Sequence, residues 1–208
     1  MRLFKSIRWF RVPNLIRVFL SGIWSGPNKC IYLTFDDGPH PEVTQWVLNV
    51  LKKHKIKATF FCVGRNIERF PDLFVKIKNE GHAVGNHTFF HEKGTKTNNL
   101  IYFKSVERTE NMIGNKLFRP PFGSIKYSQK RILRNNGYKI VFWSWLSYDF
   151  DDKVSPKFIL KKAQNIKNKD ILVFHDSRKA QKNLTEILEP VIELLMKKKF
   201  CFDIISCE

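Results

Sequence analysis

The sequence predicts an α/β fold in which parallel β-strands alternate with helices. Short apolar segments of strand length alternate along the chain with longer segments whose apolar residues recur at helical spacing. With 208 residues and 43% hydrophobic content, the chain can bury one substantial core. Neither an internal repeat nor a low-complexity linker divides it. Such alternation implies right-handed crossovers between parallel strands, which form either a closed barrel or an open doubly wound sheet.

The first strand is expected at 31–35, and a helix follows at 42–54. In that helix Val43, Val47 and Val50 recur at helical spacing. Further strands are predicted at 58–63, 83–85, 117–118, 139–143, 171–174 and 202–205. Further helices are predicted at 71–79, 98–113, 128–135, 156–166 and 184–198, and Pro156 suits the first turn of its helix.

Polar residues follow the ends of five predicted strands. In both candidate architectures, ligands bind at the carboxyl ends of the strands. The residues at these positions are Asp36 and Asp37, His87 and His91, Arg119, Asp149, and His175 and Asp176. Five separate segments therefore converge on one edge of the sheet, where we expect the functional site.

The acids Asp36 and Asp37 lie where the first strand meets the turn residues Gly38-Pro39. Alone, this pattern is also that of an ordinary turn. Beside a cation, however, one carboxylate can bind the metal while the other serves as base, because the cation offsets their mutual repulsion. His87 and His91 are four residues apart, so on a helical turn both would reach one ion. Two imidazoles and a carboxylate leave a coordination position for water, as in catalytic zinc sites.

Two further side chains fit a catalytic site, and each also has a structural interpretation. Arg119 begins a stiff loop with two prolines, where it can be solvated or can make a fixed contact with Asp36. His175 ends an apolar strand and could be an ordinary core histidine. Alternatively, an acid from 149–152 orients it and gives it charge.

The motifs together resemble those of a known enzyme family. In chain order they are TFDDGP at 34–39, HTFFH at 87–91, RPPFG at 119–123, DF at 149–150 and LVFH at 172–175. This series resembles the five motifs of the polysaccharide deacetylases, carbohydrate esterase family 4. The resemblance extends from about Cys30 to Cys207, so we expect a deacetylase domain at 30–208 after an N-terminal segment at 1–29.

The resemblance implies a distorted (β/α) barrel of about seven parallel strands and metal-assisted hydrolysis of an amide. It implies that Asp37, His87 and His91 hold one divalent ion. We expect Zn²⁺ first, although Co²⁺, Mn²⁺ or Fe²⁺ would suit the same ligands. By the same resemblance, Asp36 is the base, Arg119 orients it, and His175 is the acid, tuned by Asp149. A backbone N–H near Phe122 would stabilise the oxyanion.

The resemblance also assigns a substrate pocket and shows one departure from the family. The implied pocket residues are Pro121, Phe122, Phe150 and Leu172. The fourth motif of the family is Asp-x-x-Asp-Trp, whereas this chain has Leu146 at the first position and Phe150 at the last. The chain keeps the second aspartate of the motif as Asp149, which is the position credited in the family with holding the acid histidine. We therefore expect activity with an altered pocket.

The net charge of +18 favours polyanionic surroundings. We expect no nucleic acid partner, because Lys is spread over nearly every polar segment instead of being clustered around aromatic residues.

The segment 1–29 is basic and amphipathic, and two interpretations stand equal: docking to an anionic membrane surface, or packing on the domain through Trp9, Phe10, Leu15 and Phe19. Because Arg17 interrupts the longest apolar run, we expect no cleavable signal peptide. We expect a cytoplasmic or peripheral membrane location over a secreted one, and a monomer.

The chain has four cysteines, Cys30, Cys62, Cys201 and Cys207. They show no C-x-x-C pair and are too sparse for a disulfide-stapled domain, so we expect them to be mostly reduced. Cys201 and Cys207 could pair only if the last strand allows it.

The leading functional hypothesis is an N-acetyl hydrolase of an amino-sugar glycan of the peptidoglycan or chitooligosaccharide type. The enzymatic alternative is a deacylase or deformylase of a lipid-linked sugar, or an amidase of small molecules. The non-enzymatic alternative is an inactive glycan-binding protein. A set that contains base, acid and metal ligands argues against simple binding.

Overall fold

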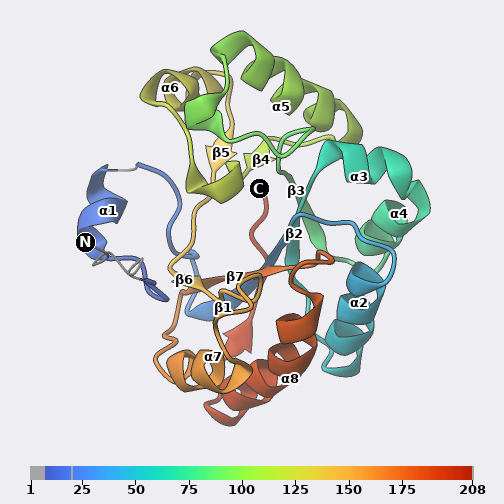
Figure 1. Ribbon diagram of the computed structural model, residues 1–208, viewed down its shortest axis with the longest axis vertical. Coiled ribbons are helices and arrows are strands. Elements are labelled where there is room, and N and C mark those ends of the chain that lie inside the picture. Colours follow the sequence, from blue (N-terminus) through green and yellow to red (C-terminus); the bar gives the residue numbers. More distant parts are fainter. Residues whose placement is uncertain (1–7, 20, 208) are drawn as a thin grey trace.

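A curled sheet of parallel strands forms the centre of the molecule, with helices around its outside (Figure 1). The computed structural model describes residues 8–19 and 21–207. The strands are β1 (Cys30–Asp36), β2 (Thr59–Cys62), β3 (Ala83–Asn86), β4 (Leu117–Phe118), β5 (Lys139–Ile140), β6 (Trp145–Leu146), β7 (Ile171–His175) and β8 (Cys201–Phe202). Seven of them follow the order β5-β4-β3-β2-β1-β7-β6, and β8 pairs with β1. All these pairings are parallel, which confirms the predicted distorted barrel of about seven parallel strands.

Helices cover the outer face of the sheet, and all but the first lie in the connections between strands (Figure 1). They are α1 (Asn14–Phe19), α2 (Val43–Lys53), α3 (Gly64–Arg69), α4 (Pro71–Asn79), α5 (Asn99–Ile113), α6 (Tyr127–Asn135), α7 (Pro156–Ala163) and α8 (Gln181–Lys197). The apolar faces of α2 and α8 pack on β1 and β7 in the largest core cluster. The crossovers bring the carboxyl ends of the strands to one rim.

Side chains alternate between the two faces of each strand, and β7 shows the consequence for the site. Leu172 and Phe174 belong to the core cluster that contains the helix residues. Ile171 belongs instead to a cluster on the inner face. Because strand side chains have a period of two, Val173 and His175 share the inner face with Ile171.

Part of the N-terminal segment packs on the two end strands of the sheet. Arg11 forms an antiparallel bridge with Trp145 in β6, and Ile23 forms a parallel bridge with Val141 just after β5. Phe10 is 6% exposed, whereas Trp9 is 45% exposed. Residues 1–7 and the side chains of Leu15 and Phe19 lie outside the described part. Packing on the domain is thus observed for part of the segment, and docking to anionic lipid stays a prediction.

Several predicted elements differ from the observed ones. The expected strand at 139–143 ends at Ile140, and β6 follows it as a separate short strand. The sequence pattern did not predict α3, and the last strand is Cys201–Phe202 instead of 202–205. Gly64 at the start of α3 is needed for close packing, because a Cβ there would lie 2.5 Å from the Phe89 ring.

The cysteine prediction was wrong for one pair. Parallel pairing of β1 with β8 places Cys30 opposite Cys201, with their Cα atoms 4.7 Å apart, and the two form a disulfide. Their sequence separation of 171 hid this proximity in the sequence. Cys62 and Cys207 are free thiols.

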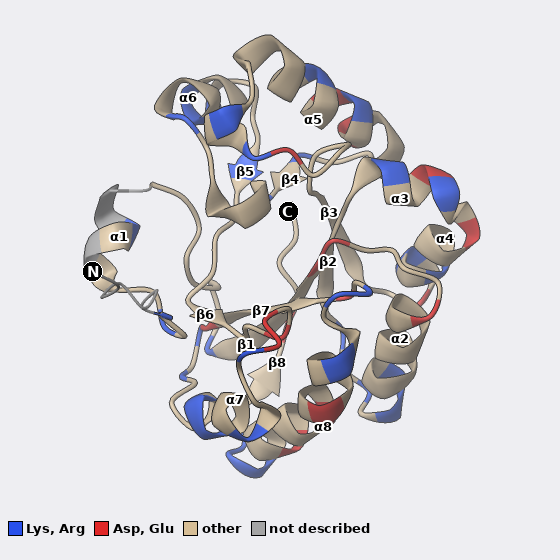
Figure 2. Ribbon diagram, viewed as in Figure 1, with Lys and Arg blue, Asp and Glu red and all other residues tan. Residues whose placement is uncertain are grey.

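Basic residues are spread over the outer helices and several loops (Figure 2). Among the described residues, no helix is long and apolar enough to cross a membrane.

Candidate active site

A buried ion pair forms the floor of the site at the end of β1. Asp36 is 4% exposed and Arg119 is fully buried. Arg119 Nη1 donates to Asp36 Oδ1 at 2.7 Å and to Thr34 Oγ1 at 2.7 Å. The guanidinium carbon also lies 4.0 Å from the centre of the Phe61 ring. The predicted contact between Arg119 and Asp36 is therefore present, and it fixes the orientation of the carboxylate.

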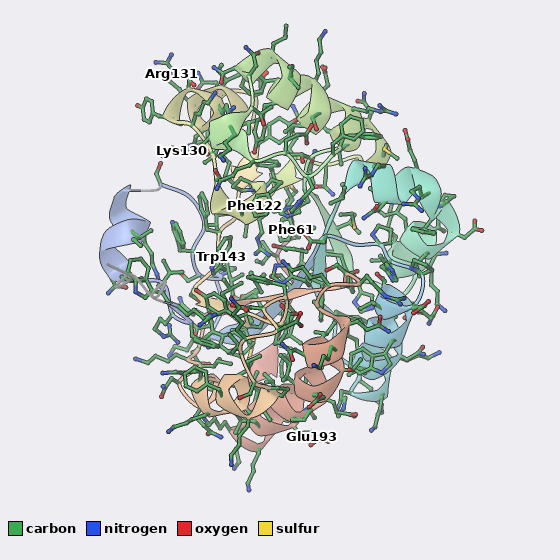
Figure 3. The ribbon with its side chains drawn as sticks, viewed as in Figure 1. Phe61, Phe122, Lys130, Arg131, Trp143 and Glu193 are labelled. Atoms are coloured by element: carbon green, nitrogen blue, oxygen red, sulfur yellow. A yellow bond between two sulfur atoms is a disulfide. The ribbon has the colours of Figure 1, made fainter. Side chains whose placement is uncertain are left out.

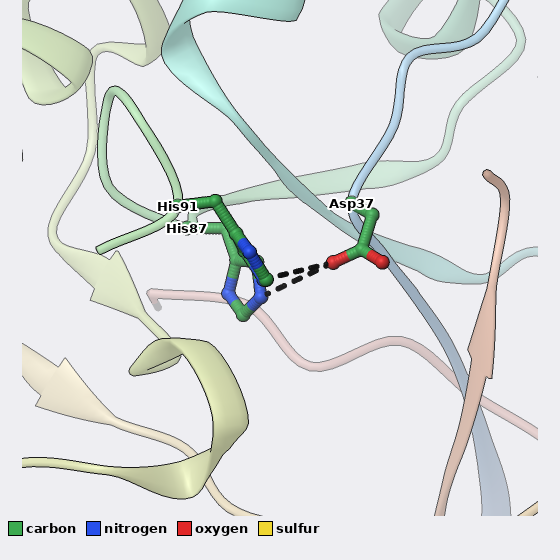
Figure 4. A group of neighbouring side chains, drawn as sticks. All are labelled: Asp37, His87 and His91. Carbon is green, nitrogen blue, oxygen red and sulfur yellow. Dashed lines mark ion pairs between the residues drawn. The ribbon is translucent and has the colours of Figure 1, made fainter. Parts of the chain in front are cut away.

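Asp37, His87 and His91 form a cluster with metal-ligand geometry (Figure 4). One potential ligand atom from each residue lies within 4.8 Å of the others. Asp37 Oδ1 is 3.1 Å from His91 Nε2 and 3.7 Å from His87 Nε2. The Nδ1 of His87 lies 2.8 Å from the carbonyl oxygen of Arg119, so Nδ1 carries the proton and Nε2 has a free lone pair.

The protonation states of this cluster suit a cation. Burial lowers the pKa of His87 to about 4, which keeps the imidazole in the neutral form that binds metals. Burial alone would raise the pKa of Asp37. The hydrogen bond from His91 and the nearby histidine charges outweigh that effect and hold the pKa below its usual range. One imidazole kept neutral by burial, a second imidazole and one carboxylate are a ligand set that fits a divalent transition metal.

The two histidines do not lie on a helical turn, which corrects the sequence prediction. Residues 87–91 form a loop, in which Thr88 has φ 60° and His91 has φ 61°. The Thr88 N–H donates to the Asn86 side chain at 2.9 Å, and the Glu92 N–H donates to Thr88 Oγ1 at 3.1 Å. These local hydrogen bonds replace helical ones and still direct both imidazoles toward Asp37.

Two further residues hold the turn after Asp37: Asp176, which was predicted only as a polar residue at the end of its strand, and Asn66, which the sequence patterns did not indicate. Asp176 Oδ1 accepts from the Gly38 N–H at 3.1 Å, and its Oδ2 accepts from Thr44 Oγ1 at 2.5 Å. A Cβ at position 38 would lie 2.0 Å from Asp176 Oδ2, so only glycine allows this approach. Asn66 Nδ2 donates to the Asp37 carbonyl at 2.7 Å. Burial raises the pKa of Asp176 to about 8.

His175 and Asp149 form the second acid–base pair of the site. His175 Nδ1 lies 2.7 Å from Asp149 Oδ1, and the His175 N–H donates to Asp149 Oδ2 at 2.8 Å. Burial alone would lower the pKa of His175. The fully buried Asp149 carboxylate outweighs it, and the pKa is raised to about 9. The imidazole is therefore charged at neutral pH and can donate a proton from Nε2.

These groups open into one cavity of about 600 Å³. It is lined by Asp36, Asp37, Val63, Arg65, Asn66, His87, His91, Phe122, Trp143, Leu146, Phe150, Val173, His175, Ser177, Arg178 and Lys179. The Phe122 ring is 63% exposed and its centre lies 4.6 Å from that of His91. Phe122 and Trp143 both lie in the central region of the molecule, far from the peripheral Glu193 (Figure 3).

Two of the four predicted pocket residues do not line the cavity. Phe122 and Phe150 do, but Leu172 faces the helices in the core, because it lies on the opposite face of β7 from His175. Val173 takes the expected place. Pro121 is buried within its loop and does not line the cavity. Leu146, which replaces the family aspartate, adds an apolar wall.

The sequence profile described as polysaccharide deacetylase matches residues 25–141. A peptidoglycan-N-acetylglucosamine deacetylase of Bacillus cereus is 34% identical over 200 residues, covering 88% of this chain and 90% of that protein. The chain belongs to the polysaccharide deacetylase family. Another such deacetylase of Bacillus cereus is 42% identical over 129 residues, which cover 58% of this chain and only 47% of that protein.

The fold agrees with this family. The structure of a peptidoglycan N-acetylglucosamine deacetylase in complex with 4-naphthalen-1-yl-N-oxidanyl-benzamide matches with a TM-score of 0.85 at 31% identity, covering 93% of this chain and 95% of that one. Polysaccharide deacetylases are metal-dependent, and the cluster of Asp37, His87 and His91 is the corresponding candidate metal site.

Proposed function

We propose that this polysaccharide deacetylase hydrolyses N-acetyl groups of an amino-sugar glycan of the peptidoglycan or chitooligosaccharide type. The observation that carries the proposal is one cavity lined by a candidate metal cluster, a buried carboxylate and a charged histidine. Relatives over most of the chain are named for deacetylation of such glycans. A protein that only binds glycans has no need of all three groups.

We propose that Asp37, His87 and His91 hold one divalent ion, and that Zn²⁺ is the first choice for two imidazoles and a carboxylate. When bound, the ion supplies Lewis-acid activation of water and of the amide carbonyl. The donor set fits, since His87 is neutral and its Nε2 is directed at Asp37. Co²⁺, Mn²⁺ and Fe²⁺ suit the same ligands, so elemental analysis of freshly purified protein identifies the ion.

The chain's own residues then account for the proton transfers. Asp36, held by Arg119, accepts a proton from the attacking water. The backbone N–H of Phe122 donates to the oxyanion as it develops on the acetyl group. His175, charged through Asp149, donates a proton to the departing amine of the sugar. Phe150, Leu146 and Val173 form an apolar wall that suits the acetyl methyl group.

The test is release of acetate from N-acetylated glycans, measured for the wild type with and without a chelator. We expect metal-dependent release that falls by at least about 100-fold in Asp36→Ala. The matched control is Asp72→Ala, which removes an exposed carboxylate on α4. Glycan binding without metal-dependent release of acetate would reject the proposal in favour of a binding protein.

A further inference from the structure

Apart from the acid–base groups and the metal-ligand cluster, every charged side chain that lines the cavity is cationic. These side chains are Arg65, Arg178 and Lys179. The acids in the lining are Asp36, which pairs with Arg119, and Asp37, which faces the two histidines. The rim therefore carries positive charge that the chemistry of amide hydrolysis does not require.

The backbone around these cations is well anchored. The Arg65 N–H donates to the Phe89 carbonyl at 2.9 Å, which ties the start of α3 to the loop that carries the two histidines. Arg178 and Lys179 lie in the turn between β7 and α8, where the Ala180 N–H donates to the Ser177 carbonyl at 3.1 Å and Ala180 is fully buried. Both segments therefore have an anchored backbone, from which exposed cationic side chains line the cavity.

The protein itself neutralises little of this charge. Arg178 lies 3.4 Å from Glu42, but the two side chains are 73% and 63% exposed, so the pair is weak. Within residues 8–19 and 21–207, Arg65 and Lys179 have no carboxylate partner within salt-bridge distance. The Lys179 ammonium lies 5.4 Å from the centre of the Phe150 ring.

Lys179 lies near the candidate proton donor, and Arg65 belongs to the segment that holds a metal ligand. The Lys179 ammonium is 5.4 Å from the centre of the Phe150 ring, which is 4.8 Å from that of His175. Arg65 directly precedes Asn66, whose side chain donates to the Asp37 carbonyl. The cavity lining also includes Phe122 and Trp143, which suit the apolar face of a sugar ring.

We propose that the substrate is an acidic glycan, in which a carboxylate lies beside the N-acetylated sugar, and that Arg65, Arg178 and Lys179 bind this carboxylate. Guanidinium groups match carboxylates in geometry as well as charge. A glycan that carries peptides with free carboxyl ends has this chemistry, whereas a neutral chitooligosaccharide lacks it. This inference rests on the proposed function and names the substrate class of the same site.

The experiment compares three substrates of equal glycan length with metal-loaded enzyme: a peptide-bearing glycan fragment, the same fragment with its carboxylates amidated, and neutral chitotetraose. The site variant is R65Q/R178Q/K179Q. The matched control is K157Q/K161Q/K197Q, which removes three exposed cations that do not line the cavity.

For the wild type we expect a KM at least about ten-fold lower for the free carboxylates than for the amidated fragment. The site variant should lose this preference through KM, and the control should keep it. The preference should also shrink as salt is added. Equal KM values in the wild type, a preference that survives in the site variant, or an equal loss in the control would each overturn the inference.

Chitotetraose separates this inference from the function on which it rests. Metal-dependent acetate release with no preference for carboxylates keeps the proposed function and rejects the acidic substrate. No release from any of the three substrates rejects both. If the triple variant melts at a lower temperature than the wild type, the single variants R65Q and K179Q repeat the comparison.

Discussion

The hydrogen bond between His175 and Asp149 sets the protonation state of the candidate general acid. With a pKa raised to about 9, His175 carries its proton at neutral pH and loses it as pH rises through that value. Activity should therefore be present below about pH 9 and fall above it. Asp149→Asn removes the negative charge that raises the pKa of His175. The alkaline limit of kcat/KM should therefore move to lower pH, and kcat should fall by about 100-fold.

The pH profile of kcat/KM measures this shift, and Asp152→Asn is the control, since it changes an exposed acid nearby in the sequence. An alkaline limit that stays in place in Asp149→Asn would contradict the role of Asp149.

Arg119 and Asp36 are coupled because both are buried. Arg119→Met would leave the Asp36 carboxylate buried without its partner, so the free energy of unfolding should fall by about 3 kcal/mol. The double variant Arg119→Met, Asp36→Asn should regain part of that stability and none of the activity. Urea unfolding and acetate release measure the two effects. A single variant as stable as the wild type would show that the pair is not coupled in this way.

The sequence predicted which side chains gather at the candidate site, because polar residues that directly follow parallel strands lie at one edge of the sheet. Asp36, His87, Arg119 and His175 could be placed together on that basis. Leu172 was assigned wrongly, although the two-residue period of a strand that ends in His175 points to Val173. Asp176 was predicted only to lie at this edge, since its role depends on the approach of Gly38 from the neighbouring strand.

At the scale of elements, long segments were predicted better than short ones. The helix at 71–79 matches α4 at both ends, because its amphipathic period extends over two turns and Pro71 marks its start. The strands β5 and β6 have two residues each, too few for any period to show. The loop at 87–91 was predicted as a helical turn because spacing alone does not reveal the positive φ of Thr88 and His91.

The N-terminal segment makes a testable contribution to the stability of the barrel. Phe10 packs on Trp145, Tyr148 and Phe158, with ring centres 6.1, 5.0 and 5.6 Å away. Phe10→Ala should therefore lower the free energy of unfolding by about 3 kcal/mol. Trp9→Ala, at a side chain that is 45% exposed, should cost less than about 1 kcal/mol. Chemical denaturation compares the two. Equal small effects would mean that this segment does not pack on the domain in solution.

At the scale of the whole molecule, the disulfide between Cys30 and Cys201 joins β1 to β8, which are the first and last strands in chain order. It closes a loop with a sequence separation of 171 residues. In the chain-entropy description, a loop of this length stabilises the fold by about 5 kcal/mol, since the cross-link restricts the unfolded chain. Cys201→Ser should therefore melt at a clearly lower temperature than the wild type, and a reducing agent should lower the wild type to the same value.

Cys207→Ser is the control for that experiment, since Cys207 is a free thiol, and its melting temperature should stay close to that of the wild type. If wild type and Cys201→Ser melt together under oxidising conditions, the bond contributes no stability, and the parallel pairing of β1 with β8 alone holds the first and last strands of the chain together.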